Sequence, residues 1–483
     1  MIKRLKEKWS GVPVQVKATT AYTVCSILQK CLSLITMPLF TRLLTTEQYG
    51  QYSVYTSWSG ILTIFLTLYL GYGSFSTAMV KFEKDRRGYI CGVQGVCIGL
   101  TVLFLALYLP LQNLWNSWFE LPTPLVLLMV VEILTGFAIT CFYEVNRFEY
   151  RYKSVVGLTL LNVVISPALA LLLVLNVQER GYARIIGYAA GNIIVGLCLF
   201  IYNTLKGGGK NTFSKKYWTY ALKFNIPLIP YYLSQVVFNQ SDRIMISHFS
   251  GTDKAGMYGV AYTLATILLF VLNSINNAYI PWFYGKIKEG KTKENRPTAN
   301  GIAGLMAFLL LAVIAVAPEI ILIMAGEPYR EAMWVVPPVA MSLLLLFYTQ
   351  LFINVEFYYE EKMMLVWGSI GAAVLNVVLN WWLIPVFGFV AAGYTTLASY
   401  VAFAVSNYFA VKYISRKRNV PFDYFDLKAL LIILAVFVAL SFTATALYEL
   451  LIVRYCIVAA VLLGLIIFHK KVIAFVKSVL VRK

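Results

Sequence analysis

The sequence is poor in the residues that build catalytic and metal sites. It has 2 histidines and 7 cysteines among 483 residues, and 13% of its residues are charged. No cysteine or histidine cluster has the spacing of a metal site, and no nucleophile elbow or catalytic triad occurs. The cysteines lie in apolar segments, where a thiol behaves as a small apolar side chain. We therefore expect no enzyme activity, no disulfide, no metal and no cofactor.

A nucleotide-binding loop is also missing. Gly207, Gly208 and Gly209 precede Lys210, but the spacing Gly-x4-Gly-Lys-Ser/Thr is absent and no strand pattern comes before it. We interpret this stretch as a flexible linker.

Apolar residues dominate the composition. Hydrophobic residues make up 60% of the chain, the mean hydropathy is +0.72, and the apolar residues form runs of about 20, the length of a membrane-spanning helix. Spanning helices satisfy their backbone hydrogen bonds internally, so we predict an all-α polytopic membrane protein. The net charge of +19 then indicates basic loops facing an anionic leaflet rather than nucleic-acid binding.

Counting the apolar runs predicts about 14 transmembrane helices. We place them at 18–42, 53–74, 88–110, 121–143, 154–176, 184–205, 223–247, 256–281, 300–325, 332–355, 363–385, 389–413, 427–448 and 451–469. An even number puts both termini on one side of the membrane. Most of the 41 basic residues fall in alternate segments that include both termini, which predicts that the N and C termini are cytoplasmic.

One stretch occurs twice, after the first and after the seventh predicted span. Thr46 to Val54 matches Thr252 to Val260 at an offset of 206, with Thr, an acid, Gly, Tyr and Val in the same places. We interpret each copy as a turn in which Gly50 or Gly256 takes the special φ and the Thr or the acid caps the next helix.

Further matches at similar offsets extend this repeat. Leu161 to Val164 recurs as Leu375 to Val378, and Gly187-Tyr188 recurs as Gly393-Tyr394. A six-helix unit returns the chain to its starting side, so the two halves share one orientation about a pseudo-twofold axis along the membrane normal. The predicted parts are an N-terminal bundle (1–205), a cytoplasmic linker (206–222), a C-terminal bundle (223–413) and an appended helix pair with a basic tail (414–483).

Two equivalent bundles predict a central cavity lined by polar faces of equivalent helices. Polar side chains recur at helical steps in the first and seventh spans, and matching positions follow in the eighth. The candidate cavity residues are Tyr22, Gln29, Lys30, Tyr231, Gln235, Asn239, Arg243, Asn273 and Asn277. The alternative is that these polar groups only join helices to one another.

Charges inside apolar spans are costly and need a partner or water. Lys30 and Glu132 could form a structural ion pair within the first bundle. Alternatively, Lys30 and Arg243 present positive charge to an anionic substrate, while Glu132, Asp242 or Glu356 takes up a coupling cation. Glu356 lies near a predicted cytoplasmic helix end, where simple solvation is a further alternative.

The first hairpin, Pro38 to Tyr52, resembles the amino-terminal signature of polysaccharide-biosynthesis flippases. These Wzx-type proteins belong to the multidrug/oligosaccharidyl-lipid/polysaccharide (MOP) exporter superfamily. Ser241 to Ile244, followed by Gly256 to Tyr262, resembles the family's seventh-helix pattern. The resemblance covers essentially the whole chain and does not identify a substrate.

The resemblance implies a transporter in the bacterial cytoplasmic (inner) membrane. Such a protein flips undecaprenyl-pyrophosphate-linked oligosaccharide by alternating access, for capsule, O-antigen or another surface polymer. The expected partners are this glycolipid, membrane lipid and H⁺ or Na⁺, with no nucleic acid. We expect a monomer, with transient contact to a polymerase or glycosyltransferases left open.

Three rival functions remain on the sequence alone. A multidrug/cation antiporter shares the two-bundle plan, and a lipid II flippase shares the fourteen helices and the basic cavity. A membrane glycosyltransferase or polymerase would carry a large outer loop with paired acids or arginines, and no predicted outer loop is long.

Overall fold

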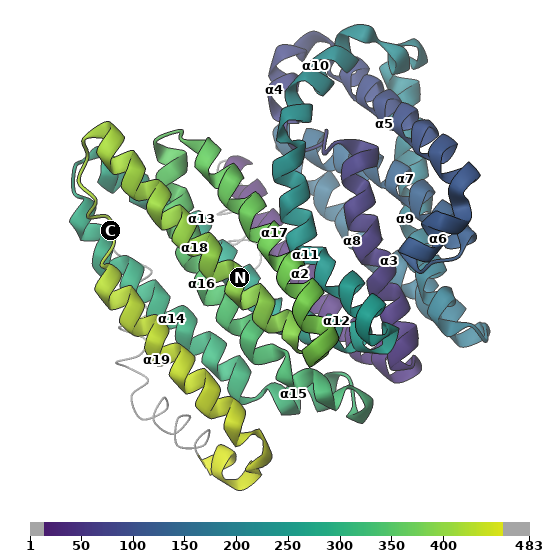
Figure 1. Ribbon diagram of the computed structural model, residues 1–483. Coiled ribbons are helices and arrows are strands. Elements are labelled where there is room, and N and C mark those ends of the chain that lie inside the picture. Colours follow the sequence, from purple (N-terminus) through teal and green to yellow (C-terminus); the bar gives the residue numbers. More distant parts are fainter. Residues whose placement is uncertain (1–13, 457–483) are drawn as a thin grey trace, which may run out of the picture. The chain divides into compact units, whose positions relative to one another are not determined.

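Helices account for all regular structure in the described part of the chain. The computed structural model describes residues 14–456, and every regular element in that range is an α-helix or a short 3-10 helix (Figure 1). By packing, the chain divides into unit 1, which ends at Ser247, and unit 2, which begins at His248. The predicted terminal basic segments and most of the span 451–469 lie outside the described residues.

Unit 1 is built from long helices joined by short helical connections. Its elements are α2 (Val14–Leu43), α3 (Thr46–Thr67), α4 (Phe75–Lys81), η1 (Glu83–Asp85), α5 (Arg86–Tyr108), η2 (Leu109–Leu111), α6 (Gln112–Phe119), α7 (Thr123–Phe148), α8 (Tyr152–Asn176), α9 (Arg180–Gly207), η3 (Gly209–Phe213), α10 (Lys215–Asn225), η4 (Ile226–Leu228) and α11 (Ile229–Ser250). The boundary between the units falls in the last turn of α11. The predicted boundaries at 205 and 223 follow the sequence repeat and stay a prediction.

Unit 2 is organised around α16, whose side chains are almost all buried. Its elements are α12 (Thr252–Ala265), η5 (Thr266–Leu268), α13 (Leu269–Lys288), η6 (Thr292–Glu294), α14 (Asn295–Ala315), α15 (Ala317–Met324), η7 (Glu327–Trp334), α16 (Val336–Tyr358), α17 (Lys362–Phe387), α18 (Ala391–Arg418), α19 (Leu427–Ala446) and η8 (Leu447–Glu449). The appended helix α19 packs along α14 and α16 (Figure 1). Tyr348 on α16 donates a 2.9 Å hydrogen bond to the Leu430 carbonyl, so α19 is bound to the centre of the unit.

The prediction of an all-α polytopic membrane protein is confirmed. Within residues 14–456, ten helical stretches are long and apolar enough to cross a bilayer. Helices α3, α11 and α18 coincide with the second, seventh and twelfth predicted spans, and each carries many hydroxyl, amide and tyrosine side chains. The predicted span 53–74 is too long at its end, because α3 stops at Thr67 and the next two residues are left-handed, Leu68 with φ 47° and Tyr69 with φ 50°.

The repeated turn has a different construction from the one predicted. Gly50 and Gly256 lie inside α3 and α12, where both are buried, and neither has a positive φ. Thr45 caps α3 in a capping box with Gln48, and Gly251, with φ 103°, precedes α12. The assignment of the special φ to Gly50 and Gly256 was wrong, because each helix begins four residues before the glycine.

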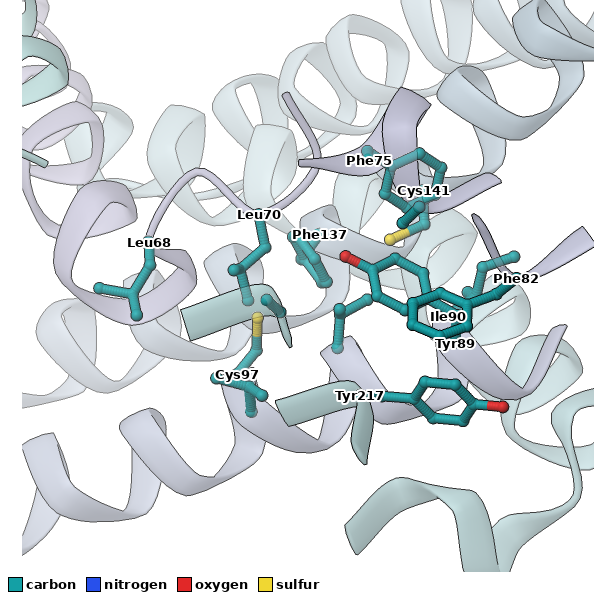
Figure 2. Close-up of a cluster of buried hydrophobic side chains, with 14 of the residues drawn as sticks. Leu68, Leu70, Phe75, Phe82, Tyr89, Ile90, Cys97, Phe137, Cys141 and Tyr217 are labelled. Atoms are coloured by element: carbon teal, nitrogen blue, oxygen red, sulfur yellow. The ribbon is translucent and has the colours of Figure 1, made fainter. Parts of the chain in front are cut away.

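The stretch predicted as a flexible linker is folded onto α5. It forms η3 and α10, and the Trp218 indole N–H donates a 2.8 Å hydrogen bond to the Thr212 carbonyl. Gly95 on α5 makes room for this stretch, since a Cβ there would lie 1.8 Å from the Thr212 oxygen. Figure 2 shows Tyr217 of α10 beside Tyr89 and Phe82, in a cluster of buried apolar side chains that binds α10 to α5 and α7.

Candidate functional site

Glu132 on α7 is a carboxylate enclosed between three helices of unit 1. Tyr55 on α3 donates a 2.8 Å hydrogen bond to Oε2, and Asn192 on α9 donates a 2.7 Å hydrogen bond to Oε1. A carboxylate in an apolar span is costly unless hydrogen bonds replace its water. These two donors meet that need from different helices.

The close approach of α9 to α7 places Asn192 beside Glu132. Gly196 on α9 has no side chain to hold the helices apart, and a Cβ there would lie 2.6 Å from the Thr135 carbonyl oxygen on α7. Small residues at helix contacts are the usual means by which membrane helices approach closely. The Asn192 amide therefore reaches the Glu132 carboxylate one turn closer to the start of each helix.

A cavity of about 310 Å³ adjoins Glu132 and Asn192. Ser59, Thr63 and Thr67 recur at steps of four on α3 and line it with hydroxyl groups, and Thr140 of α7 faces the same space. Tyr69 and Tyr72, just beyond the left-handed end of α3, complete the lining, and the Tyr69 ring stacks on Tyr232 of α11 at 5.0 Å. Oxygen atoms and one carboxylate are the groups that bind a proton or a hard cation.

A similar polar cluster joins α8 to α9 in unit 1 and α17 to α18 in unit 2. In unit 1, Ser166 on α8 donates 3.3 Å hydrogen bonds to Asn162 and Asn192. In unit 2, the Asn380 amide on α17 donates to Asn376, which in turn donates to Thr396 on α18. Asn162 and Ser166 of α8 match Asn376 and Asn380 of α17 in the sequence repeat, whereas their partners on α9 and α18 stand at different repeat positions. Each cluster holds its helix pair together.

The predicted cavity residues of the first span lie on α2. Gln29 and Lys30 are exposed, and Tyr22 is half-buried with the Arg147 guanidinium 5.9 Å from its ring. No ion pair joins Lys30 to Glu132, although both residues are described; the carboxylate is held by Tyr55 and Asn192 instead. The structural ion-pair alternative for Lys30 and Glu132 is therefore absent from this structure.

The predicted residues of the seventh span lie on α11, within unit 1. Asn239 is exposed and donates to the Gln235 carbonyl, while Asp242 is 2% exposed. Arg243 donates a 2.8 Å hydrogen bond to the Gln240 side chain, which also accepts from Ser57 on α3. Tyr231 and Gln235 are half-buried.

In unit 2, the predicted residues separate into exposed and buried ones. Asn273 and Asn277 are exposed on α13, whereas the neighbouring Asn276 is buried and accepts a 2.9 Å hydrogen bond from Asn354 on α16. Glu356 is 1% exposed, and neither of its carboxylate oxygens has a hydrogen-bond partner among the described residues. The alternative of a simply solvated Glu356 does not match this burial.

Tyr55, Asn192 and the α3 hydroxyls are site residues that the sequence prediction missed. Ser59, Thr63 and Thr67 recur every fourth residue in an apolar segment, and this spacing is a signal for one polar helix face. Tyr55 and Asn192 lie 77 and 60 residues from Glu132, and nothing in the sequence pairs them with it.

Comparison with known proteins gives a family and a fold. The model of the family described as "Polysaccharide biosynthesis protein" matches residues 16–285, more than half of the chain. A protein of the Lsg locus of Haemophilus influenzae is 25% identical over 286 residues, which cover 57% of this chain and 67% of that protein. A second Haemophilus influenzae protein, described as a membrane protein, is 22% identical over 58% of this chain and 67% of its own length.

Two solved structures share the fold at low sequence identity. The lipid II flippase MurJ, in an inward closed conformation, aligns with a TM-score of 0.69 at 13% identity, covering 93% of this chain and 99% of that one. An inward-facing multidrug resistance MATE family transporter of the MOP superfamily aligns with a TM-score of 0.59 at 13% identity, covering 83% and 99%. The chain therefore belongs to the polysaccharide biosynthesis protein family, as a multi-pass membrane protein whose fold is shared with these two solved structures.

Proposed function

We propose that this protein flips undecaprenyl-pyrophosphate-linked oligosaccharide across the bacterial cytoplasmic membrane, for capsule, O-antigen or another surface polysaccharide. The observation that carries the proposal is the match of residues 16–285 to the polysaccharide biosynthesis family. The likeness of the fold to that of MurJ, a lipid II flippase, supports it.

The proposed topology has fourteen crossings, with both termini in the cytoplasm. The ten apolar helical stretches, together with α3, α11, α18 and the predicted span 451–469, are its basis. The basic residues of the alternate loops support the orientation. Two like-oriented bundles would then rock about a central site and expose it to each side in turn.

Positive side chains of that central site would receive the pyrophosphate. Lys30 is exposed on α2, and Arg243 is held on α11 by Gln240. A bidentate guanidinium and an ammonium both suit phosphate oxygens. Tyr22, Tyr231, Gln29, Gln235, Asn239, Asn273 and Asn277 would contact the sugar through aromatic faces and amides.

Glu132 is the best-supported coupling group for H⁺ or Na⁺. Its carboxylate adjoins a hydroxyl-lined cavity of about 310 Å³, a feature that supports cation uptake within unit 1. Asp242 and Glu356 are the other candidates, and both are buried. The alternative function is that of a multidrug/cation antiporter of the same superfamily, in which Glu132 could bind the exchanged cation.

Transport assays with the full-length protein in proteoliposomes test the proposal. We expect movement of a fluorescent undecaprenyl-pyrophosphate-linked oligosaccharide between leaflets, measured by accessibility to an external quencher. Lipid II and a cationic dye, assayed in the same vesicles, test the two rival functions. Movement of the dye alone, or of lipid II alone, would reject the proposed substrate.

Variants of the two basic residues test the central site. Lys30→Ala and Arg243→Ala should each abolish translocation while the protein level stays normal. Arg243→Lys keeps the positive charge and removes the planar guanidinium that can bind two phosphate oxygens at once. Lys84→Ala, an exposed basic residue in η1, is the matched control. Normal transport by Lys30→Ala and Arg243→Ala would remove both residues from the site.

A further inference from the structure

A second polar cavity lies at the end of unit 1 where α5 and α8 begin and α7 and α9 end. Its volume is about 250 Å³, and it contains none of the residues of the Glu132 cavity. Four basic side chains line it, Arg86, Arg87, Arg151 and Lys206, with Glu149 as the single acid. Three positive charges in this cavity are therefore unmatched within its own lining.

Glu149 engages two of these four cations. Its carboxylate lies 3.0 Å from Arg151 and 3.8 Å from Arg86, and Arg86 also donates to the Met79 carbonyl. Arg87 and Lys206 are exposed, and neither forms an ion pair with any residue between 14 and 456. Gly207 brings them together, because a Cβ there would lie 2.7 Å from the Arg87 carbonyl oxygen.

Asn203 adds an unsatisfied donor to the same cavity. It lines the cavity one turn before Lys206, and its Nδ2 is enclosed without an acceptor among the described residues. Enclosed polar groups are nearly always hydrogen-bonded, so the Asn203 amide N–H₂ is a donor for an oxygen of a molecule that enters the cavity. Together, Asn203, Arg87 and Lys206 form a site for an anion with several acceptor oxygens.

An exposed apolar face of α9 leads to the cavity. Ile194, Leu197, Ile201 and Leu205 follow one another at steps of three and four, and all four are exposed. Such spacing places them along one side of the helix. Tyr202, which lines the cavity, is also about half exposed beside this face. An acyl or prenyl chain could lie along α9 while its head group occupies the cavity.

We propose that this cavity binds the phosphate or pyrophosphate head group of an anionic lipid. Basic pockets between membrane helices on the cytoplasmic side are suited to anionic head groups, and the cytoplasmic placement rests on the orientation proposed above. The volume is slightly below the about 300–1,000 Å³ of pockets that enclose a whole small molecule, so it fits a head group whose tail remains in the bilayer. The lipid supplies several phosphate oxygens to Arg87, Lys206 and Asn203.

Native mass spectrometry of the purified full-length protein tests this site without any transport step. The probes are phosphatidylglycerol, phosphatidylethanolamine and undecaprenyl pyrophosphate, each titrated separately. We expect an anionic lipid to bind more tightly than zwitterionic phosphatidylethanolamine. Each basic residue near an anionic head group raises the affinity by about fivefold. The double variant Arg87→Gln/Lys206→Gln should therefore weaken that binding by roughly ten- to thirty-fold.

A matched double variant removes the same charge outside the cavity. Lys84→Gln/Lys210→Gln changes two exposed basic residues in η1 and η3, and its binding should stay within about twofold of the unaltered protein. Asn203→Asp places a negative charge in the cavity and should weaken binding without removing a surface cation. Melting temperatures of all variants check that the fold is retained.

The outcomes separate the two lipid sources and the proposed transport function. Binding of phosphatidylglycerol alone assigns the site to membrane lipid, and binding of undecaprenyl pyrophosphate alone assigns it to the substrate head group. Equal loss in the two double variants, or no loss in Arg87→Gln/Lys206→Gln, overturns the proposal. A protein that binds the lipid here and fails to translocate glycolipid would reject the proposed function and keep this site.

Discussion

The Tyr55 hydroxyl on α3 donates a 2.8 Å hydrogen bond to the Glu132 carboxylate on α7. Asn192 on α9 donates to the other carboxylate oxygen at 2.7 Å, so one side chain joins three helices of unit 1. Both bonds use the carboxylate as an acceptor. In the proposed transport cycle, neutralisation of Glu132 by a proton or a cation would change its contacts to α3 and α9 together, and this would couple cation uptake to helix movement.

Replacing Glu132 with Gln tests whether this carboxylate binds the coupling cation. Gln keeps the size of the side chain and its acceptor oxygen, but it carries no charge. We expect gradient-driven transport in proteoliposomes to fall by about 5- to 150-fold, the usual range of coupling between sites. Transport down the substrate's own gradient should persist.

Tyr55→Phe is the control for this experiment. It removes a hydrogen bond to Glu132 and keeps the negative charge, so the response to an imposed H⁺ or Na⁺ gradient should remain while the rate changes modestly. An unaltered gradient response in Glu132→Gln would exclude Glu132 as the coupling group and leave Asp242 and Glu356.

Arg184 on α9 lies in an aromatic cage, and its replacement should destabilise unit 1. The side chain is 4% exposed, and its guanidinium carbon lies 3.9 Å from the Tyr52 ring centroid, 4.1 Å from that of Tyr49 and 4.7 Å from that of Phe40. Desolvated cation–π contacts contribute about 2 kcal/mol, and the stem adds packing. Arg184→Ala should therefore cost about 2–4 kcal/mol of unfolding free energy, measured by thermal denaturation in detergent.

Two further variants separate the charge of Arg184 from its bulk. Arg184→Lys keeps the charge and loses the planar stacking, so an intermediate loss is expected. Arg184→Met keeps much of the apolar stem without charge. If Arg184→Met melted at the temperature of the unaltered protein, packing of the side-chain stem alone would explain the contribution of Arg184 to stability, and the cation–π contribution would be negligible.

The sequence predicted the parts of the fold that depend on local composition. Long apolar runs marked α5, α7, α8 and α9 to within a few residues, because a bilayer requires about 20 apolar residues in each crossing helix. The left-handed break at Leu68 and Tyr69 was missed, since neither residue type favours a positive φ. The docking of η3 on α5 was missed because it depends on Gly95, a position whose role appears only when Thr212 packs against it.

The candidate site was predicted only where a residue is unusual in its own segment. Glu132 stands out as a charge in an apolar run, so it could be found from sequence. Its partners Tyr55 and Asn192 are ordinary polar residues, and their contact with Glu132 follows from the packing of α3 and α9 on α7. Whether Lys30 and Arg243 contact substrate stays a prediction.

Glu361, between α16 and α17, should make the stability of unit 2 depend on pH through its ion pairs with Lys417 and Arg418. A hydrogen bond from Lys417 at 2.7 Å, helped by Arg418, holds the pKa of the Glu361 carboxyl below its ordinary value of 4.5. A carboxyl whose folded-state pKa is lowered stabilises the fold above its ordinary pKa, and this contribution disappears as the pH falls through the lowered value.

The corresponding experiment compares melting temperatures of the unaltered protein and Glu361→Gln across pH. Glu361→Gln should melt at a slightly lower temperature at pH 7, and the difference should vanish at a pH below 4.5. The effect should also shrink in high salt, because the groups are exposed to solvent. A difference that stayed constant from pH 7 to acid pH would mean that the loss comes from something other than the ion pair.

Two glycines of α5 should respond in opposite directions to the same substitution. A Cβ at Gly95 would lie 1.8 Å from the Thr212 carbonyl oxygen, so Gly95→Ala must push η3 off α5 and should cost about 1–3 kcal/mol. A Cβ at Gly99 would meet only the Trp218 ring at 3.5 Å, an ordinary contact, so Gly99→Ala should gain up to about 1 kcal/mol from helix propensity. Thermal denaturation gives both changes, and limited proteolysis in the 206–215 stretch should be faster in Gly95→Ala alone. Equal melting temperatures for the two variants would show that η3 does not pack against Gly95.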